Sequence, residues 1–137
     1  MITKEQLAEH DIHCFINAYD IKNEQGLPLD FKDRMFLWDI YSDMSPFQAV
    51  IKPPQIGMTV LETIKSLWVA KNKKKDIIYT LPTQSDVTDM AGGKVNRIIA
   101  QNPILKEWIK EHDSVEQKTV GDNIIYYRGT WTTKQAM

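Results

Sequence analysis

The feature that most constrains this chain is a pair of short apolar segments separated by one amphipathic segment. Residues 47–52 (FQAVIK) and 76–81 (DIIYTL) each have the length and apolar content of a buried strand. Between them, five apolar residues fall at helical spacing, namely Val60, Leu61, Ile64, Leu67 and Trp68. Strands that alternate with helices are typical of a parallel sheet. The predicted fold class is therefore α/β, with a parallel sheet flanked by helices.

Local signals predict the other elements. Apolar periodicity and caps predict helices over residues 3–19, 30–43, 85–101 and 102–112, and residues 116–129 read as a hairpin around Gly121, Asp122 and Asn123. The first helix opens with a capping box of Thr3 and Gln6, the third is capped by Ser85 or Asp86, and the fourth by Asn102 with Pro103 at its first position. The second has a wide apolar face of Met35, Phe36, Trp38, Ile40 and Tyr41.

Charge is unevenly distributed along the 137 residues, although the net charge is only −1. Residues 1–51 hold four basic and nine acidic residues, whereas residues 52–110 hold ten basic and five acidic. The basic surplus includes the run Lys73–Lys75, which either faces an anionic polymer or forms a solvated loop between helix and strand. The solvated loop is the simpler interpretation.

The sequence has one cysteine, Cys14, so no internal disulfide is expected and a reducing compartment fits. The N-terminal residues lack the apolar core of a secretory signal, and no apolar run approaches the ~20 residues that span a bilayer. A soluble, intracellular protein without membrane contact is expected.

The loop between the first strand and its helix, residues 52–59 (KPPQIGMT), partly matches a phosphate-binding loop. Against G-x-x-x-x-G-K-[ST], Gly57 and Thr59 match, while Lys52 takes the first glycine position and Met58 the lysine position. A lysine at the front of a short loop can still reach a phosphate. Spacing alone leaves two readings open: a phosphate loop, or a strand-to-helix turn with a threonine cap.

Several motifs together resemble a known family. They are a DIYSD segment before the first strand, a loop of the form K-x-x-Q-x-G-x-[ST], a second strand that ends in Pro82–Thr83, a helix with PIL, and a hairpin that ends in YRGTW. In this order and spacing, residues 31–133 resemble the start of the ATPase domain of tailed-phage terminase large subunits. Those proteins are motors that package viral DNA and cut it.

The resemblance implies a partial P-loop NTPase (RecA/ASCE-like) fold, with residues 1–45 as a helical lead-in and residues 46–137 as an incomplete ATPase core. It implies ATP and Mg²⁺ as cofactors. The implied phosphate-binding residues are Lys52, Gln55, Ile56, Gly57, Met58 and Thr59. Lys52 would contact the β- and γ-phosphates, Thr59 would ligate Mg²⁺, and Pro82 and Thr83 would lie near the nucleotide or the DNA.

The sequence departs from the family at two points. Many relatives carry a glutamine before the loop that reads adenine, whereas this chain has Arg34 in that stretch. No apolar strand ending in Asp-Glu follows the loop, and such an ATPase needs one for Mg²⁺ and for activating water. The chain is therefore expected to be a fragment, truncated before the acidic strand, that does not hydrolyse ATP alone.

Three functional hypotheses follow. The first is a fragment of a DNA-packaging motor, which implies double-stranded DNA, a small terminase subunit and a portal as partners, an oligomer at full length, and the cytoplasm of a bacterial host as the location. The second is a non-catalytic α/β interaction module whose loop is only a turn. The third is a helicase-like ATPase, which the front lysine and the DIYSD segment fit less well.

Two further groups of residues could form functional sites, but a structural interpretation is simpler. His10, His13 and Cys14 could share a helical face as metal ligands, but zinc needs a fourth ligand, so surface residues are the expectation. The tryptophans could stack on bases. Trp38 and Trp68 are expected in the core, and Arg128 is expected as a surface charge in the hairpin.

Overall fold

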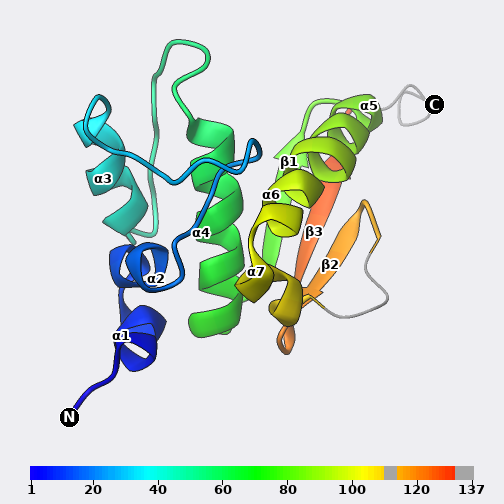
Figure 1. Cartoon of the computed structure of the whole chain (residues 1–137). Helices are drawn as coiled ribbons and strands as arrows, with labels where there is room; N and C mark the ends of the chain where they lie inside the picture. The colour runs from blue at the N-terminus through cyan, green and yellow to red at the C-terminus, as the bar shows by residue number, and fades with distance from the viewer. Residues whose placement is uncertain (110–113, 132–137) are drawn as a thin grey trace.

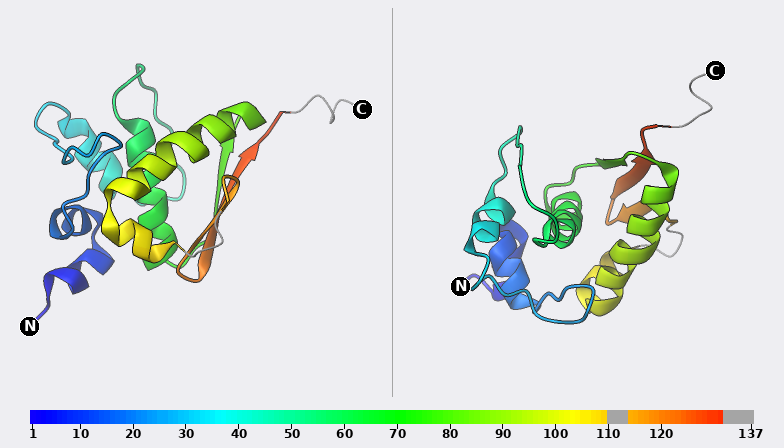
Figure 2. Two further views of the ribbon diagram at one scale, coloured as in Figure 1. Left: turned by 45° about the vertical axis from the view of Figure 1, so that its right-hand side comes forward. Right: turned by 90° about the horizontal axis from the view of Figure 1, so that it is seen from above.

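The molecule is built as three groups of elements side by side: the N-terminal helices, one long central helix, and a small sheet with the helices that cover it (Figures 1 and 2). The computed structural model describes residues 1–109 and 114–131. The helical elements are α1 (Lys4–His10), α2 (Ile12–Ala18), α3 (Met35–Ser42), α4 (Met58–Asn72), α5 (Gln84–Val87), the π-helical segment η1 (Thr88–Val95), α6 (Asn96–Gln101) and α7 (Pro103–Trp108). The strands are β1 (Ile77–Leu81), β2 (Gln117–Val120) and β3 (Asn123–Gly129).

The sheet is mixed, with strand order β1-β3-β2. β1 and β3 are parallel, and Ile77 lies opposite Ile125. β2 is antiparallel to β3 because a tight turn at Gly121 and Asp122 joins them, and Gly121 adopts a φ of +60°. The α/β class and the hairpin are confirmed. The sheet is mixed and not parallel as predicted, because the hairpin adds β2 antiparallel to β3.

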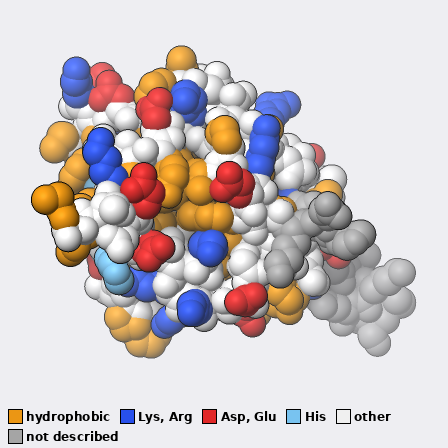
Figure 3. All heavy atoms as spheres, turned by 60° about the horizontal axis from the view of Figure 1, so that its bottom comes forward, with side chains coloured by type: hydrophobic (Ala, Val, Ile, Leu, Met, Phe, Trp, Pro, Cys, Tyr) orange, Lys and Arg blue, Asp and Glu red, His pale blue; other side chains and the backbone are white. Residues whose placement is uncertain are grey.

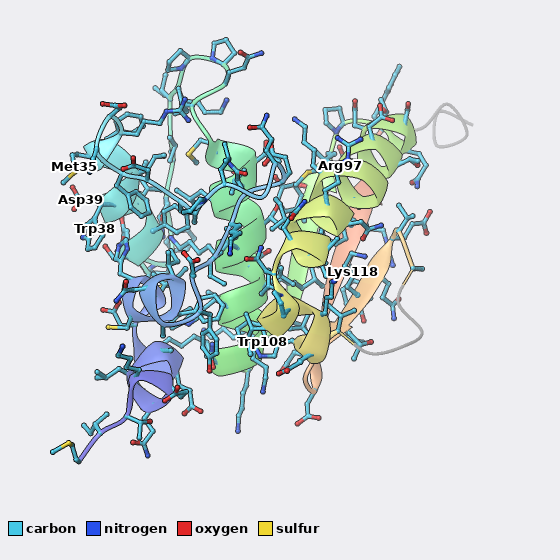
Figure 4. All side chains as sticks on the ribbon, viewed as in Figure 1. Met35, Trp38, Asp39, Arg97, Trp108 and Lys118 are labelled. Carbon is cyan, nitrogen blue, oxygen red and sulfur yellow. The ribbon has the colours of Figure 1, made fainter. Side chains whose placement is uncertain are left out.

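Helices cover one face of this sheet. The covered face carries Val120, Ile125 and Tyr127, which are fully buried, and the helices α4 and α5 contact these strands. Lys118 is also on this face and reaches α6, where its Nζ donates to Asn96 Oδ1 at 2.7 Å (Figure 4). The opposite face carries Ile78, which is 68% exposed.

The central helix α4 matches its predicted position. Four of the five residues of the predicted stripe, Leu61, Ile64, Leu67 and Trp68, are buried as expected, and Val60 is half-buried. Met58 and Ala70 are buried as well. Trp68 also donates from Nε1 to the backbone oxygen of Ala8 at 2.8 Å, which attaches α1 to α4. Buried residues from α1 to β3 form one hydrophobic core around this helix.

The first predicted helix is interrupted. The capping box of Thr3 and Gln6 is confirmed, but α1 ends at His10 and α2 begins at Ile12. Asp11 causes the break, since its carboxylate accepts hydrogen bonds from the backbone N–H groups of His13 and Cys14 and so caps α2. One continuous helix over residues 3–19 was therefore a wrong prediction.

The second predicted helix is shorter and buries a different face. Only residues 35–42 are helical, and the buried residues are Leu37 and Tyr41. Met35, Phe36 and Trp38 are exposed, so Trp38 is not a core residue. Met35 and Trp38 point away from α4 (Figure 4). A segment this rich in apolar residues has several possible buried faces, and packing on α2 and α4 selects the one with Leu37.

Residues 47–52 do not form the predicted strand. The segment lies in the long connection between α3 and α4, and the side chain of Phe47 is 93% exposed. A strand requires a neighbour to bond its backbone groups, and no described strand is hydrogen-bonded to this segment. Pro53 and Pro54, which follow it, have no N–H group to extend a ladder.

The helical segment after β1 follows the prediction with two changes. Thr83, not Ser85 or Asp86, is the cap, and it forms a capping box with Asp86. The segment over residues 88–95, which contains Gly92 and Gly93, is π-helical. Asn102 precedes α7 as predicted, but its side chain bonds other groups instead of capping that helix.

The surface mixes charges of both signs. On the face shown in Figure 3, hydrophobic side chains gather in a central area, and acidic and basic side chains lie around it. Within residues 1–109 and 114–131, no helix is long and apolar enough to cross a membrane.

Candidate phosphate-binding site

The loop before α4 ends in a turn that glycine favours. Gly57 is the N-cap of α4 and has a φ of +91°, and Gln55 also has a positive φ of +58°. Gly57 lacks a side chain that could cap the helix, and no side chain of a described residue bonds the first N–H groups of α4. These groups and the helix dipole provide partial positive charge at the end of a 15-residue helix.

Thr59 is not the cap that the simpler reading predicted. It is the second residue of α4, and its side chain is half-buried. Among the described residues nothing bonds its hydroxyl, although its backbone oxygen accepts from Thr63 Oγ1 at 2.7 Å. The hydroxyl is therefore not used by a hydrogen bond to a described residue and can serve a ligand.

All six loop residues of the predicted site line one cavity. The cavity has a volume of about 560 Å³ and lies at the N-terminal end of α4. Its lining consists of Asn23, Glu24, Gln25, Arg34, Lys52, Gln55, Ile56, Gly57, Met58, Thr59, Val60, Lys94 and Ile98. We call this the loop cavity. Most of its members are polar or charged, which suits a polar ligand.

The charged lining is predominantly basic. Arg34, Lys52 and Lys94 come from three separate segments, and Glu24 is the acidic residue among the lining residues. The Nζ of Lys52 contacts the backbone oxygen of Pro53 at 3.4 Å, a long hydrogen bond. Neither Arg34 nor Lys94 has a side-chain hydrogen bond or an ion pair with any described residue. Among the described residues, no Asp or Glu carboxylate forms an ion pair with these three cations, although Glu24 lines the same cavity.

Met58 occupies the position where a standard phosphate loop carries lysine. Its side chain is only 7% exposed and belongs to the hydrophobic core. Met58 can therefore contribute its backbone N–H group to the loop cavity, but no charge. Within residues 52–59, Lys52 supplies the charge.

Pro82 and Thr83 do not line the loop cavity. They follow β1 and start α5, and Thr83 Oγ1 bonds the Asp86 carboxylate at 2.8 Å. The backbone oxygen of Pro82 accepts from Trp131 N at 2.9 Å. A Cβ atom at Gly129 would lie 2.8 Å from the Thr83 backbone, so β3 approaches this turn closely. Their predicted place near nucleotide or DNA stays a prediction.

The cavity also contains residues that the sequence did not indicate. Residues 23–25 and Lys94 are about 70 positions apart, and a buried amide brings their segments together. Asn102, 2% exposed, accepts from Lys22 N at 2.7 Å and donates to Lys22 O at 2.9 Å. No local sequence pattern predicts this contact between Asn102 and Lys22.

A second, apolar cavity lies between α4, β1 and residues 48–52. It measures about 450 Å³, and Gln48, Val50, Ile77 and Tyr79 belong to its walls. The hydroxyl of Tyr79 donates to the carboxylate of Glu62, which also lines it. Burial, together with the Glu62 carboxylate, raises the pKa of Tyr79 far above its ordinary value. This cavity occupies the place where a strand at residues 47–52 would have to meet β1.

The other candidate groups do not form sites. The described residues contain no group of three or more His, Cys, Asp or Glu side chains that could hold a metal. His13 instead stacks on Trp38 at a centroid distance of 3.6 Å. Arg128 is exposed as expected and lies over the ring of Tyr126 at 5.1 Å.

Comparisons of this chain with protein-family models, with curated proteins and with solved structures found no significant match.

Proposed function

We propose that the loop cavity binds the phosphate chain of ATP, and that this chain is the front part of an ATPase domain similar to that of tailed-phage terminase large subunits. The observation that carries the proposal is that residues 52–59 line one polar cavity at the start of α4 together with basic side chains. Unbonded N–H groups at a helix N-terminus and nearby cations are the features that hold phosphate oxygens.

Each loop residue then has a physical role. Lys52 supplies charge to the β- and γ-phosphates, and its flexible stem allows approach from the front of the loop. Gly57 permits the turn that leaves the N–H groups of α4 open to a ligand. Gln55, Ile56 and Met58 contribute backbone around the phosphates. The Thr59 hydroxyl would hold Mg²⁺, which neutralises phosphate charge when it is bound.

The fold supports the proposal only at a coarse level. The order of α4 and β1, with β1 parallel to β3, is compatible with an incomplete P-loop NTPase sheet, in which residues 47–52 form no strand before the loop. In this proposal residues 46–137 are the incomplete core and residues 1–45 a helical lead-in. Double-stranded DNA, a small terminase subunit, a portal, other copies of the chain and the cytoplasm of a bacterial host belong to the same proposal.

Calorimetric titration of the chain with MgATP tests it. The wild-type chain is expected to bind, Lys52→Ala to lower the affinity at least about tenfold, and Thr59→Val to remove the gain in affinity that Mg²⁺ provides. Lys75→Ala is the matched control, because Lys75 is an exposed lysine outside the loop cavity. Equal affinities for wild type and Lys52→Ala, or no binding at all, would contradict the proposal.

A second candidate is a non-catalytic interaction module. The exposed apolar side chains of Phe36, Phe47 and Ile51 favour it, since such groups often mark contact surfaces. This function predicts that the chain shows no response to nucleotide and that Lys52→Ala leaves every activity intact. The titration above separates the two candidates.

A further inference from the structure

We infer that Arg34 and Lys94 are phosphate-contacting residues, and that they make the loop cavity selective for a chain of several phosphates. The inference rests on the proposed function, because it concerns the same cavity. Neither residue lies in the loop of residues 52–59, and neither matches a phosphate-binding motif.

The Arg34 side chain lies close to the start of α4. A Cβ atom at Gly57 would lie 3.3 Å from Arg34 Nη1. The guanidinium group therefore lies against the helix end where the N–H groups are unbonded. A cation beside the positive end of a helix dipole is repelled by it. An anion bound next to both groups would instead be attracted by the guanidinium group and by the N-terminus of α4.

Lys94 approaches the cavity from the other side of α4. It lies in η1, on the helical layer that covers the sheet, and is exposed. The π-helical geometry gives η1 a wider turn than an α-helix, and such segments frequently occur at functional sites. Lys94 and Lys52 thus reach the same cavity from separate segments of the chain.

The charge balance of the cavity points to a polyanion. Three basic side chains face it, and Glu24 is the acidic one. One Glu24 carboxylate oxygen is buried without a hydrogen-bond partner among the described residues, and no ion pair joins Glu24 to a described basic residue. A single phosphate can be held by the loop and one lysine. Three separated cations instead fit the several charges along a di- or triphosphate.

The test is a titration of the wild-type chain and of Arg34→Gln, Lys94→Gln and the double variant with MgATP, inorganic tripolyphosphate and AMP. Each single variant is expected to bind MgATP and tripolyphosphate about tenfold more weakly, while AMP binding changes by less than about twofold. Arg34→Lys should recover part of the affinity. The control is Arg97→Gln, because Arg97 is an exposed residue of α6 that does not line the cavity (Figure 4).

The outcomes separate this inference from the proposed function. If Lys52→Ala loses MgATP affinity while Arg34→Gln and Lys94→Gln, folded by circular dichroism, bind MgATP and tripolyphosphate like wild type, the inference is wrong and the proposed function stands. If tripolyphosphate binds through Arg34 and Lys94 but MgATP does not bind, the inference holds and the nucleotide function is contradicted. If neither ligand binds the wild-type chain, both are wrong.

Discussion

At the scale of single residues, Gly57 decides how the chain enters α4. Its φ of +91° lies in the left-handed region, where a side chain causes strain. The absence of a side chain also leaves room for Arg34, which contacts the same turn. The geometry of the loop cavity thus depends on Gly57, a residue without a functional side chain.

Gly57→Ala is expected to lower the free energy of unfolding by about 1–2 kcal/mol, because alanine must adopt a positive φ. Chemical denaturation measures it. Gly93→Ala is the control, because a Cβ atom there meets nothing within 4 Å and its φ is not positive. That variant should be unchanged or more stable by up to about 1 kcal/mol. Equal effects of the two substitutions would contradict the account.

Asn102 does not line the loop cavity, but it joins two of the segments that do. Its buried side chain bonds the N–H and the C=O of Lys22 and donates to Ile98 O at 2.7 Å. These bonds hold residues 23–25 near η1 and α6, although the two segments are far apart in the sequence.

Asn102→Ala is expected to destabilise the chain by about 1–3 kcal/mol, because it leaves the part-buried backbone groups of Lys22 and the buried backbone oxygen of Ile98 without their partner. Thermal or denaturant unfolding measures the loss. Asn17→Ala provides the comparison, since Asn17 is exposed and has no side-chain hydrogen bond with a described residue. A loss below about 0.5 kcal/mol at Asn102 would show that the bridge does not hold the fold.

At the scale of elements, one carboxylate joins the starts of the two parallel strands. Asp76, just before β1, accepts from the backbone N of Ile124 at 2.9 Å and from Asn123 Nδ2 at 3.0 Å. The hydrogen bond from Ile124, followed by that from Asn123, lowers the pKa of Asp76 below its usual value of 3.8. The carboxylate form therefore stabilises the pairing of β1 with β3.

A carboxyl group whose pKa is lower in the folded state than in the unfolded chain stabilises the folded state at pH values above its usual pKa. This stabilisation is lost as the pH falls through the folded-state pKa. For Asp76 the loss begins near pH 3.8 and continues below it. Asp76→Asn keeps an acceptor but does not titrate, so its unfolding free energy should fall less steeply in this range. Asp89→Asn should keep the wild-type slope, because Asp89 is exposed and unbonded among the described residues. Identical slopes for all three proteins would refute the role of Asp76.

Tyr127 of β3 carries a buried hydroxyl that bonds no described residue. Burial raises its pKa well above the ordinary value. An unsatisfied buried hydroxyl costs free energy, so Tyr127→Phe is expected to leave stability unchanged or raise it by up to about 1 kcal/mol. Tyr79→Phe should instead destabilise the chain, because it removes the bond to Glu62. Destabilisation by Tyr127→Phe above about 1 kcal/mol would reveal a partner for the hydroxyl.

The elements that could be predicted from the sequence have local signals. The stripe of α4, the apolar run of β1 and the turn residues of the β2–β3 hairpin are each contained within a few residues. Residues 47–52 have an equally clear strand pattern, yet they form no strand, because a strand also needs a neighbour. The break at Asp11 was missed because its carboxylate competes with the helix for two N–H groups.

At the scale of the whole molecule, the site could be predicted only in part. The loop of residues 52–59 has a sequence pattern of its own, so its residues could be predicted as a site from the sequence. Glu24, Arg34 and Lys94 join it through packing of segments that have no sequence relation to the loop. Their contribution depends on the Asn102 bridge and on the path of residues 20–28 across α4 toward α6 (Figure 1).

The measurement that tests the central claim most directly is a map of backbone amide shifts by nuclear magnetic resonance during titration with MgATP. The largest changes are expected at Lys52 and residues 55–60, with smaller ones at residues 23–25 and around Lys94, and Lys52→Ala is expected to require at least about tenfold more MgATP to produce them. Changes confined to the sheet or to α1–α3, or no changes at millimolar MgATP, would contradict the assignment of the loop cavity as a phosphate-binding site.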